Sequence, residues 1–165
     1  MFELLFKNMY ICKCITIAIK KYLANIYFKG LKDFMEKNII NISSAFYVEG
    51  GKLLVVKDGS GKWSLPPVKL VADENFDDAL VRGIKNYFNI SVTVLDEVGS
   101  IELPKGNDVY IVMFLYIKGE GNSISSPSFK EIKFVSFAEL SSLDLIDTDE
   151  LFVKKYLDNI KKYVG

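Results

Sequence analysis

Three acidic side chains in the middle of the chain have a spacing that suits metal chemistry. Glu74, Asp77 and Asp78 are three and four positions apart, and residues at these intervals lie on one face of a helix. Carboxylate oxygens are the ligands that Mg²⁺ prefers, and a bound divalent cation can neutralise phosphate oxygens and activate water. Glu74, Asp77 and Asp78 are therefore candidate catalytic residues and candidate ligands of an Mg or Mn ion.

The same residues have a second interpretation that needs no metal. Asn75 is a typical N-cap, and the apolar residues that follow predict a helix from about Phe76 to Phe88. Acidic residues in the first turn of a helix complement the positive end of its dipole. We favour this interpretation. No metal or other cofactor is therefore expected, and Mg or Mn is required only if the chain is an active enzyme.

The composition excludes several other kinds of chemistry. The 165 residues include no histidine, which rules out a Ser-His or Cys-His nucleophile pair and a His-ligated zinc. Basic and acidic side chains number 21 each, so no overall field attracts a polyanion. Cys12 and Cys14 cannot complete a four-cysteine metal site. We interpret both as reduced residues of a cytoplasmic protein.

The elements that must position the acidic helix begin with a hairpin. Ala45 to Val48 and Leu53 to Lys57 are β-rich runs on either side of Gly50-Gly51, and a Gly-Gly pair between two apolar runs is a hairpin signal. A loop follows, and Trp63 to Leu65 leads into the segment before the helix. Pro66-Pro67 argues against a central strand there.

The remaining elements complete one α/β domain. After the helix, alternation and turn residues predict the following order: a strand over Ser91 to Glu102, a turn over Leu103 to Asp108, a buried central strand over Val109 to Ile117, a polar loop over Gly119 to Ser128, a short strand over Lys133 to Val135, a helix start over Phe137 to Leu143 and an amphipathic helix over Asp149 to Tyr163.

The N-terminal part is expected to be separate from this domain. Apolar residues recur at helical spacing from Ile15 to Lys37 with lysines between them, which predicts an amphipathic helix. We assign residues 1–40 to a helical extension and 41–165 to the main domain, with a linker over Asn38 to Ser44. The extension is a candidate surface for a protein partner or a homodimer. No membrane role is expected, because lysines interrupt the apolar run before residue 20.

Residues 61–90, GKWSLPPVKLVADENFDDALVRGIKNYFNI, resemble the Nudix box of the MutT-like pyrophosphate-cleaving hydrolases. The matching positions are Trp63, Leu65, Pro66, Lys69, Glu74, Ala79, Arg82 and Ile90. The order of elements agrees with that family from about Ser44 to Tyr156. The resemblance implies an α/β/α sandwich around a mixed β-sheet, an α/β (α+β) fold to which the N-terminal helix is added.

The box also departs from the family pattern. Gly83, Asn86 and Tyr87 stand where the family has the glutamates that bind metal, and Pro67 and Val68 stand where it has Gly-Gly. Glycine has no ligand atom, asparagine has one neutral carbonyl, and a tyrosine phenol binds Mg²⁺ poorly. A helical glycine also lowers stability, by about 0.5–1 kcal/mol relative to alanine. Gly83 is therefore expected to reflect close packing or a lost function.

These departures favour a degenerate Nudix-fold domain, a pseudoenzyme that binds a nucleotide, RNA or a protein without metal-dependent diphosphate hydrolysis. Trp63, Arg82, Tyr87 and Glu120 are the candidate ligand-binding residues, and Arg82 is also expected to pair with Glu74 or Asp73. Two alternatives remain. One is an active hydrolase of nucleoside diphosphate derivatives that uses a relocated Mg or Mn site, and the other is a structural subunit that assembles through its N-terminal helix.

Overall fold

The computed structural model describes residues 22, 25, 26, 30, 37–120 and 124–164. The chain divides into two compact units, Met1–Asn38 and Ile39–Gly165. In the first unit residues 22, 25, 26 and 30 are helical and exposed. Most of the predicted amphipathic helix from Ile15 to Lys37, together with Cys12 and Cys14, lies outside the described residues. The remaining description therefore concerns the second unit.

The predicted hairpin is confirmed. Strands β1 (Asn38–Glu49) and β2 (Lys52–Lys57) pair antiparallel, with Val48 opposite Leu53. Gly50 and Gly51 join them with φ angles of 56° and 73°. A two-residue turn with both φ angles positive has the twist that suits a hairpin, and glycine adopts it without strain.

The linker predicted over Asn38 to Ser44 is wrong, because β1 already begins at Asn38. Ser43 and Ser44 are almost completely buried, and this part of β1 pairs with β4 (Pro67–Lys69), with Ser44 opposite Pro67. The polar composition suggested a linker, but pairing with a distant strand overrides local propensity. Pro67 is the first residue of β4, a position where a strand tolerates proline.

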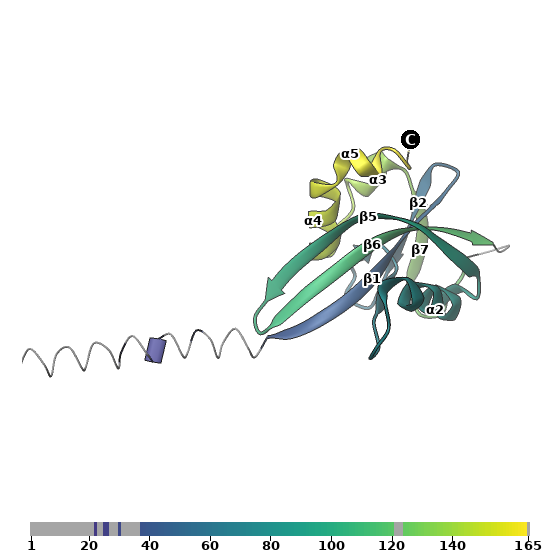
Figure 1. Ribbon diagram of the computed structural model, residues 1–165. Coiled ribbons are helices and arrows are strands. Elements are labelled where there is room, and N and C mark those ends of the chain that lie inside the picture. The colour runs from purple at the N-terminus through teal and green to yellow at the C-terminus, as the bar shows by residue number, and fades with distance from the viewer. Residues whose placement is uncertain (1–21, 23–24, 27–29, 31–36, 121–123, 165) are drawn as a thin grey trace, which may run out of the picture. The chain divides into compact units, whose positions relative to one another are not determined.

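Seven strands form one mixed sheet in the order β3-β2-β1-β6-β5, while β4 pairs with β1 and β7 with β2. The strands not yet introduced are β3 (Trp63–Ser64), β5 (Ser91–Lys105), β6 (Asp108–Glu120) and β7 (Glu131–Val135). Neighbouring strands β1 and β6 run in the same direction (Figure 1), whereas β5 and β6 run antiparallel. The mixed sheet agrees with the fold expected from the sequence.

The strands β5 and β6 are longer than predicted. The turn expected over Leu103 to Asp108 contains only Gly106 and Asn107, and Pro104 lies within β5 opposite Val109. Proline has no N–H to donate, but β5 is last in the strand order. An edge strand tolerates proline, because no further strand needs that hydrogen bond. The β5–β6 register shifts twice, between Val94 and Asp96 and between Glu97 and Gly99. Such bulges change the direction of the side chains around them.

Helix α2 (Phe76–Phe88) has the predicted bounds. Its N-cap is Asn75, whose side-chain oxygen accepts a hydrogen bond of 2.8 Å from the Asp78 N–H. Its C-cap is Asn89, which has a φ of 54°. Asparagine is one of the few residues other than glycine that adopt this left-handed conformation readily. Local capping signals therefore fix both ends of α2.

The C-terminal helices are shorter than predicted. Helix α3 (Phe137–Leu140) begins with a capping box formed by Ser136 and Glu139. The single helix expected from Asp149 to Tyr163 is divided into α4 (Asp147–Lys155) and α5 (Leu157–Ile160). They meet at Tyr156, whose hydroxyl donates a 3.0 Å hydrogen bond to the Ser100 carbonyl. This tertiary contact, which periodicity does not reveal, coincides with the break.

Two apolar cores cover the two faces of the sheet. Helix α2 lies on one face, and α3, α4 and α5 lie on the other (Figure 1). The core under the C-terminal helices centres on the stacked rings of Phe114 and Phe152, while Leu80 and Ile84 of α2 pack into the other core. The predicted α/β/α sandwich is therefore confirmed. Within the described residues, no helix combines the length and apolar character needed to cross a membrane.

Candidate functional site

An ion pair fixes the loop before α2 to the helix. Arg82 Nε donates to Glu74 Oε1 and Arg82 Nη2 donates to Glu74 Oε2, both at 2.7 Å. Arg82 Nη2 also lies 3.2 Å from the Lys69 carbonyl, and the Val71 N–H donates to Glu74 at 3.1 Å. Hydrogen bonds from Arg82 lower the pKa of Glu74 to about 2. The predicted partner of Arg82 is therefore Glu74, whose two oxygens are both engaged.

Gly83 has no room for a side chain. A Cβ atom at Gly83 would lie 2.5 Å from Val68 Cγ1 and 2.8 Å from Val68 Cβ, distances at which carbon atoms overlap. Val68 is 2% exposed and belongs to the core under α2. The expected close packing at Gly83 is present. Its partner is Val68, which stands at one of the two positions where the resembled box has Gly-Gly.

Tyr87 makes a second contact between the same two segments. Its hydroxyl donates a 3.0 Å hydrogen bond to the Pro67 carbonyl, and its ring lies 5.0 Å from the ring of Phe129. Partial burial raises the pKa of the Tyr87 phenol, so it stays protonated at neutral pH. Asn86 is exposed. This face of α2 is therefore occupied by contacts with Pro67, Val68 and the segment that carries Phe129.

The acidic residues of the helix start have different surroundings. Asp78 accepts a 2.8 Å hydrogen bond from the side-chain amide of Asn75, whereas Asp77 lines a pocket with Asp96 and Glu97. In the part of the chain that the structure describes, no three Asp, Glu, Cys or His residues are grouped as metal ligands would be. Glu74, Asp77 and Asp78 therefore have different partners.

The remaining candidate ligand-binding residues are also dispersed. Trp63 is 6% exposed, and Lys57 and Lys133 approach its ring at 5.2 and 4.6 Å. Glu120 is exposed at the end of β6. Trp63 therefore serves the core. Within residues 37–120 and 124–164, the three best-defined pockets are lined by none of Trp63, Arg82, Tyr87 and Glu120.

A pocket of about 350 Å³ contains functional groups that the sequence did not single out. Lys62, Lys105 and Tyr110 line it with three aliphatic residues from β1, β5 and the loop before α4, and Asp147 and Thr148 complete the lining. Asp147 lies 3.4 Å from the Lys105 ammonium and 4.0 Å from that of Lys62. Lysines near an aromatic ring were the only sequence signal, and it is too common to identify a site.

A carboxylate is buried beside this pocket. Asp149 of α4 is 1% exposed. Its oxygens accept hydrogen bonds from the Leu65 N–H at 2.6 Å and the Thr148 hydroxyl at 3.2 Å. Burial raises the pKa of Asp149 to about 7. The helical spacing of Asp149 from buried Phe152 and Val153 is a sequence signal for an inward carboxylate, and it was missed.

The same fold is found in solved structures of Nudix hydrolases. The MutT protein from Methanosarcina mazei Go1 is 19% identical, covers 76% of this chain and 98% of its own, and has a TM-score of 0.68. The E. coli ORF135 protein is 18% identical over 74% and 91%, with a TM-score of 0.67. The Nudix hydrolase MutT from methicillin-resistant Staphylococcus aureus 252 is 22% identical over 74% and 98%, with a TM-score of 0.63. No protein-family model and no curated protein matches the chain. The chain has the Nudix fold.

Proposed function

We propose that this Nudix-fold domain has lost metal-dependent diphosphate hydrolysis and acts as a binding module for a nucleotide-type ligand. One observation carries the proposal: Val68 fills the space beside α2 into which a side chain at position 83 would extend. Gly83 is the first of the three positions at which the resembled box has glutamates. The site has therefore exchanged a metal-binding side chain for an apolar contact between loop and helix.

The surrounding residues do not fit a divalent cation. Mg²⁺ requires several hard oxygen ligands in near-octahedral geometry. Gly83 has no side-chain ligand atom, and the phenol of Tyr87 donates a hydrogen bond to the Pro67 carbonyl. Glu74 keeps its negative charge, but both of its oxygens accept hydrogen bonds from Arg82. Hydrolysis would need another way to neutralise the phosphate oxygens and to activate water.

The pocket lined by Lys62, Lys105 and Tyr110 has the chemistry of a nucleotide-type ligand. Two ammonium groups attract phosphate oxygens, and an aromatic ring beside aliphatic side chains provides a surface for a base. Its volume of about 350 Å³ is within the range of small-molecule sites. Asp147 lies near both lysines and Asp144 lies 3.3 Å from the Lys62 ammonium, so a bound phosphate would compete with these two carboxylates for the ammonium groups.

The active-hydrolase alternative lacks a comparable observation. A relocated site needs Glu74, Asp77 and Asp78 to converge on one ion, but Arg82 engages Glu74 and Asn75 engages Asp78. RNA and protein ligands are tested together with nucleotides, because all three were expected from the sequence. A nucleotide of one or two phosphates suits this pocket better than a long polyanion, since the lining has only two lysines.

Two assays on the intact chain test the proposal. Nucleoside triphosphates, dinucleotides and nucleoside diphosphate sugars should not be hydrolysed with Mg²⁺ or Mn²⁺. Turnover that disappears in Glu74→Gln would contradict the proposal. In the absence of metal, the ligand should raise the thermal midpoint, because it binds only the folded state.

The lysine variants locate the ligand. Lys62→Ala/Lys105→Ala should abolish the thermal shift, whereas Lys52→Ala/Lys118→Ala removes the same charge from other surfaces and should preserve it. An equal loss in both double variants would show that general charge, and not the pocket, binds the ligand. Stabilisation by an RNA oligonucleotide or a protein but by no nucleotide would replace the nucleotide with that class of ligand.

A further inference from the structure

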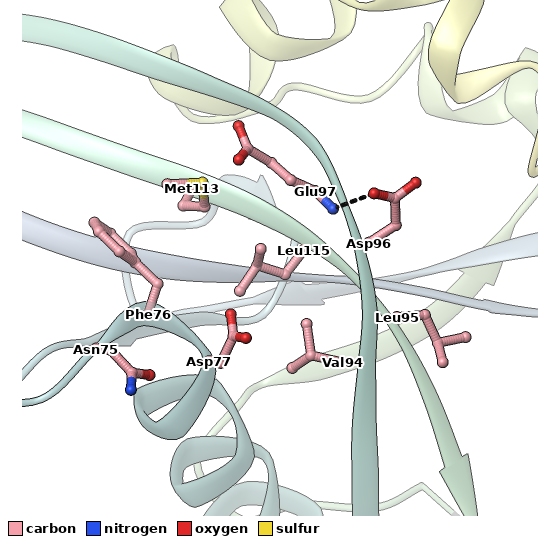
Figure 2. Close-up of a pocket in the computed structure, with 9 residues that line it drawn as sticks. All are labelled: Asn75, Phe76, Asp77, Val94, Leu95, Asp96, Glu97, Met113 and Leu115. Carbon is pink, nitrogen blue, oxygen red and sulfur yellow. Dashed lines mark hydrogen bonds between the residues drawn. The ribbon is translucent and has the colours of Figure 1, made fainter.

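A second pocket, of about 420 Å³, lies between the start of α2 and strands β5 and β6. Figure 2 shows its lining: Phe76 and Asp77 come from the helix, Val94 and Glu97 from β5, and Met113 and Leu115 from β6. Its floor is apolar, and Leu115 is only 3% exposed. The pocket is distinct from the one lined by Lys62 and Lys105, with which it shares no residue.

The bulge in β5 places a carboxylate over this apolar floor. Val94 pairs with Ile117 and Glu97 with Leu115, and both partners belong to the core under α2. Directly opposed residues of antiparallel strands point to the same face, so Val94 and Glu97 face the helix although they are three residues apart. A regular strand would put them on opposite faces. The register shift is therefore what brings Glu97 to the pocket.

The charge around the pocket has one sign. Its charged lining residues are Asp77, Asp96 and Glu97, and the lining includes no lysine or arginine. Asp96 accepts a 3.2 Å hydrogen bond from the Tyr163 hydroxyl on the opposite side of the sheet. For Asp77 and Glu97, no side-chain hydrogen bond or ion pair is found within residues 37–120 and 124–164. Two carboxylates from different elements thus remain available to a ligand.

The chemistry of this pocket selects a cation with an apolar stem. Two carboxylates attract an ammonium or guanidinium group and repel phosphate. The apolar floor suits the methylene chain of lysine or arginine, whose stem packs on apolar surface while its charged end stays near water. Leu95 also lines the pocket and is 51% exposed. A small amine would leave Leu95 uncovered, whereas a peptide that carries apolar residues beside its cation would cover it.

We propose that this pocket docks a segment of a partner protein in which a lysine or arginine is flanked by apolar residues. The cation lies between Asp77 and Glu97, and a neighbouring apolar side chain covers Leu95. The interaction does not involve the pocket lined by Lys62, Lys105 and Tyr110. The domain could therefore hold a nucleotide-type ligand and a protein partner at the same time. The proposal does not depend on the ligand of that other pocket.

Titration of the ¹⁵N-labelled full chain with the peptide acetyl-Gly-Leu-Lys-Leu-Arg-Leu-Gly-amide tests the proposal. We expect saturable amide shifts at Val94 to Glu97, Met113 and Leu115. In Asp77→Asn/Glu97→Gln the peptide should bind at least about ten-fold more weakly, which corresponds to about 1.4 kcal/mol of binding free energy. Glu102→Gln/Asp158→Asn removes the same charge elsewhere and should bind as the unmodified chain does. Lys62→Ala/Lys105→Ala should also bind normally, which separates this test from that of the proposed function.

Four results would overturn the proposal. The first is that the peptide shifts none of these amides, and the second is that the acidic analogue with Glu in place of Lys and Arg binds as tightly. Equal weakening in both charge-neutralised double variants would indicate unspecific attraction. n-Butylammonium binding as tightly as the peptide would assign the pocket to a small amine instead of a protein.

Discussion

The two halves of the box segment differ in how they hold loop and helix together. At the Glu74–Arg82 end the contact is polar and charged, with two hydrogen bonds of 2.7 Å. At the Gly83–Tyr87 end it is mainly apolar: Val68 fills the space at Gly83 and Tyr87 packs against Phe129. The difference shows that the loop can be fixed to the helix without metal ligands. The shape of this segment therefore does not require metal ligands.

The largest effect is expected from adding a side chain at the Gly83–Tyr87 end. Gly83→Glu should lower the free energy of unfolding by roughly 3–5 kcal/mol, because it overpacks a buried contact with Val68. Chemical denaturation measures this loss. In Val68→Gly/Gly83→Glu the added side chain gains space, so the double variant should be more stable than the sum of the two single losses predicts. Strict additivity would show that Val68 does not limit position 83.

Asp149 tests whether the entry to the box depends on a neutral carboxyl group. Because its folded-state pKa is raised to about 7 from 3.8, its contribution to stability is complete below about pH 4 and is lost as the pH rises through 7. Asp149→Asn retains an acceptor for the Leu65 N–H. At pH 8 it should raise the free energy of unfolding by roughly 2–4 kcal/mol, with little difference near pH 4.

Denaturation of both proteins across this pH range measures the effect. Asp144→Asn is the control: this exposed carboxylate lies in the loop before α4, and the backbone carbonyl of Asp144 accepts a hydrogen bond from the Trp63 N–H. It should not change the pH dependence. If Asp149→Asn is less stable than the unmodified chain at pH 8, the buried carboxylate is stabilising as an anion and the account of this contact is wrong.

The contribution of the Glu74–Arg82 end to stability is expected to increase with pH, whereas that of Asp149 decreases. The pKa of Glu74 is lowered to about 2 from 4.5, so its pair with Arg82 stabilises the fold above about pH 4.5 and loses this effect as the pH falls towards 2. Arg82→Ala should be less stable at neutral pH than Lys85→Ala, the control on the same helix, and less affected than Gly83→Glu. A stability difference that is unchanged at pH 2.5 would contradict an ionic origin.

The smallest effect is expected from the Tyr87 hydroxyl. Tyr87→Phe removes its hydrogen bond to the Pro67 carbonyl but keeps the ring contacts with Phe88 and Phe129. The loss should be about 1 kcal/mol. Thermal denaturation of Tyr87→Phe and Tyr87→Ala separates the hydroxyl from the ring, and equal losses would show that the ring contributes nothing.

Local signals in the sequence predicted part of this site. Asn75 and the apolar spacing predicted α2 with its bounds, and the retained Arg82 predicted an acidic partner, which is Glu74. Close packing at Gly83 was predicted, but its partner Val68 was not. A contact across a loop leaves no periodic pattern. The pocket of Lys62, Lys105 and Tyr110 was missed for the same reason, because residues from 42 to 148 form it.

Two fold predictions were wrong because tertiary contacts decided them. Polar residues suggested a linker over Asn38 to Ser44, but pairing with β4 makes this segment part of β1. Periodicity suggested one C-terminal helix, but this helix is interrupted at Tyr156, whose hydroxyl is hydrogen-bonded to the Ser100 carbonyl. The amphipathic helix from Ile15 to Lys37 and its role in assembly remain predictions, which deletion of residues 1–40 followed by a size measurement would test.

The most direct test of the proposed loss of metal binding in the box segment is paramagnetic broadening by Mn²⁺. In ¹H–¹⁵N spectra of the intact chain, the amide signals of Gly83, Asn86 and Tyr87 should stay sharp as Mn²⁺ is added. In the variant Val68→Gly/Gly83→Glu/Asn86→Glu/Tyr87→Glu, which returns carboxylates to this face, signals along the second half of α2 should broaden. Broadening at Gly83, Asn86 and Tyr87 in the unmodified chain, abolished by Glu74→Gln, would contradict the loss of the metal site.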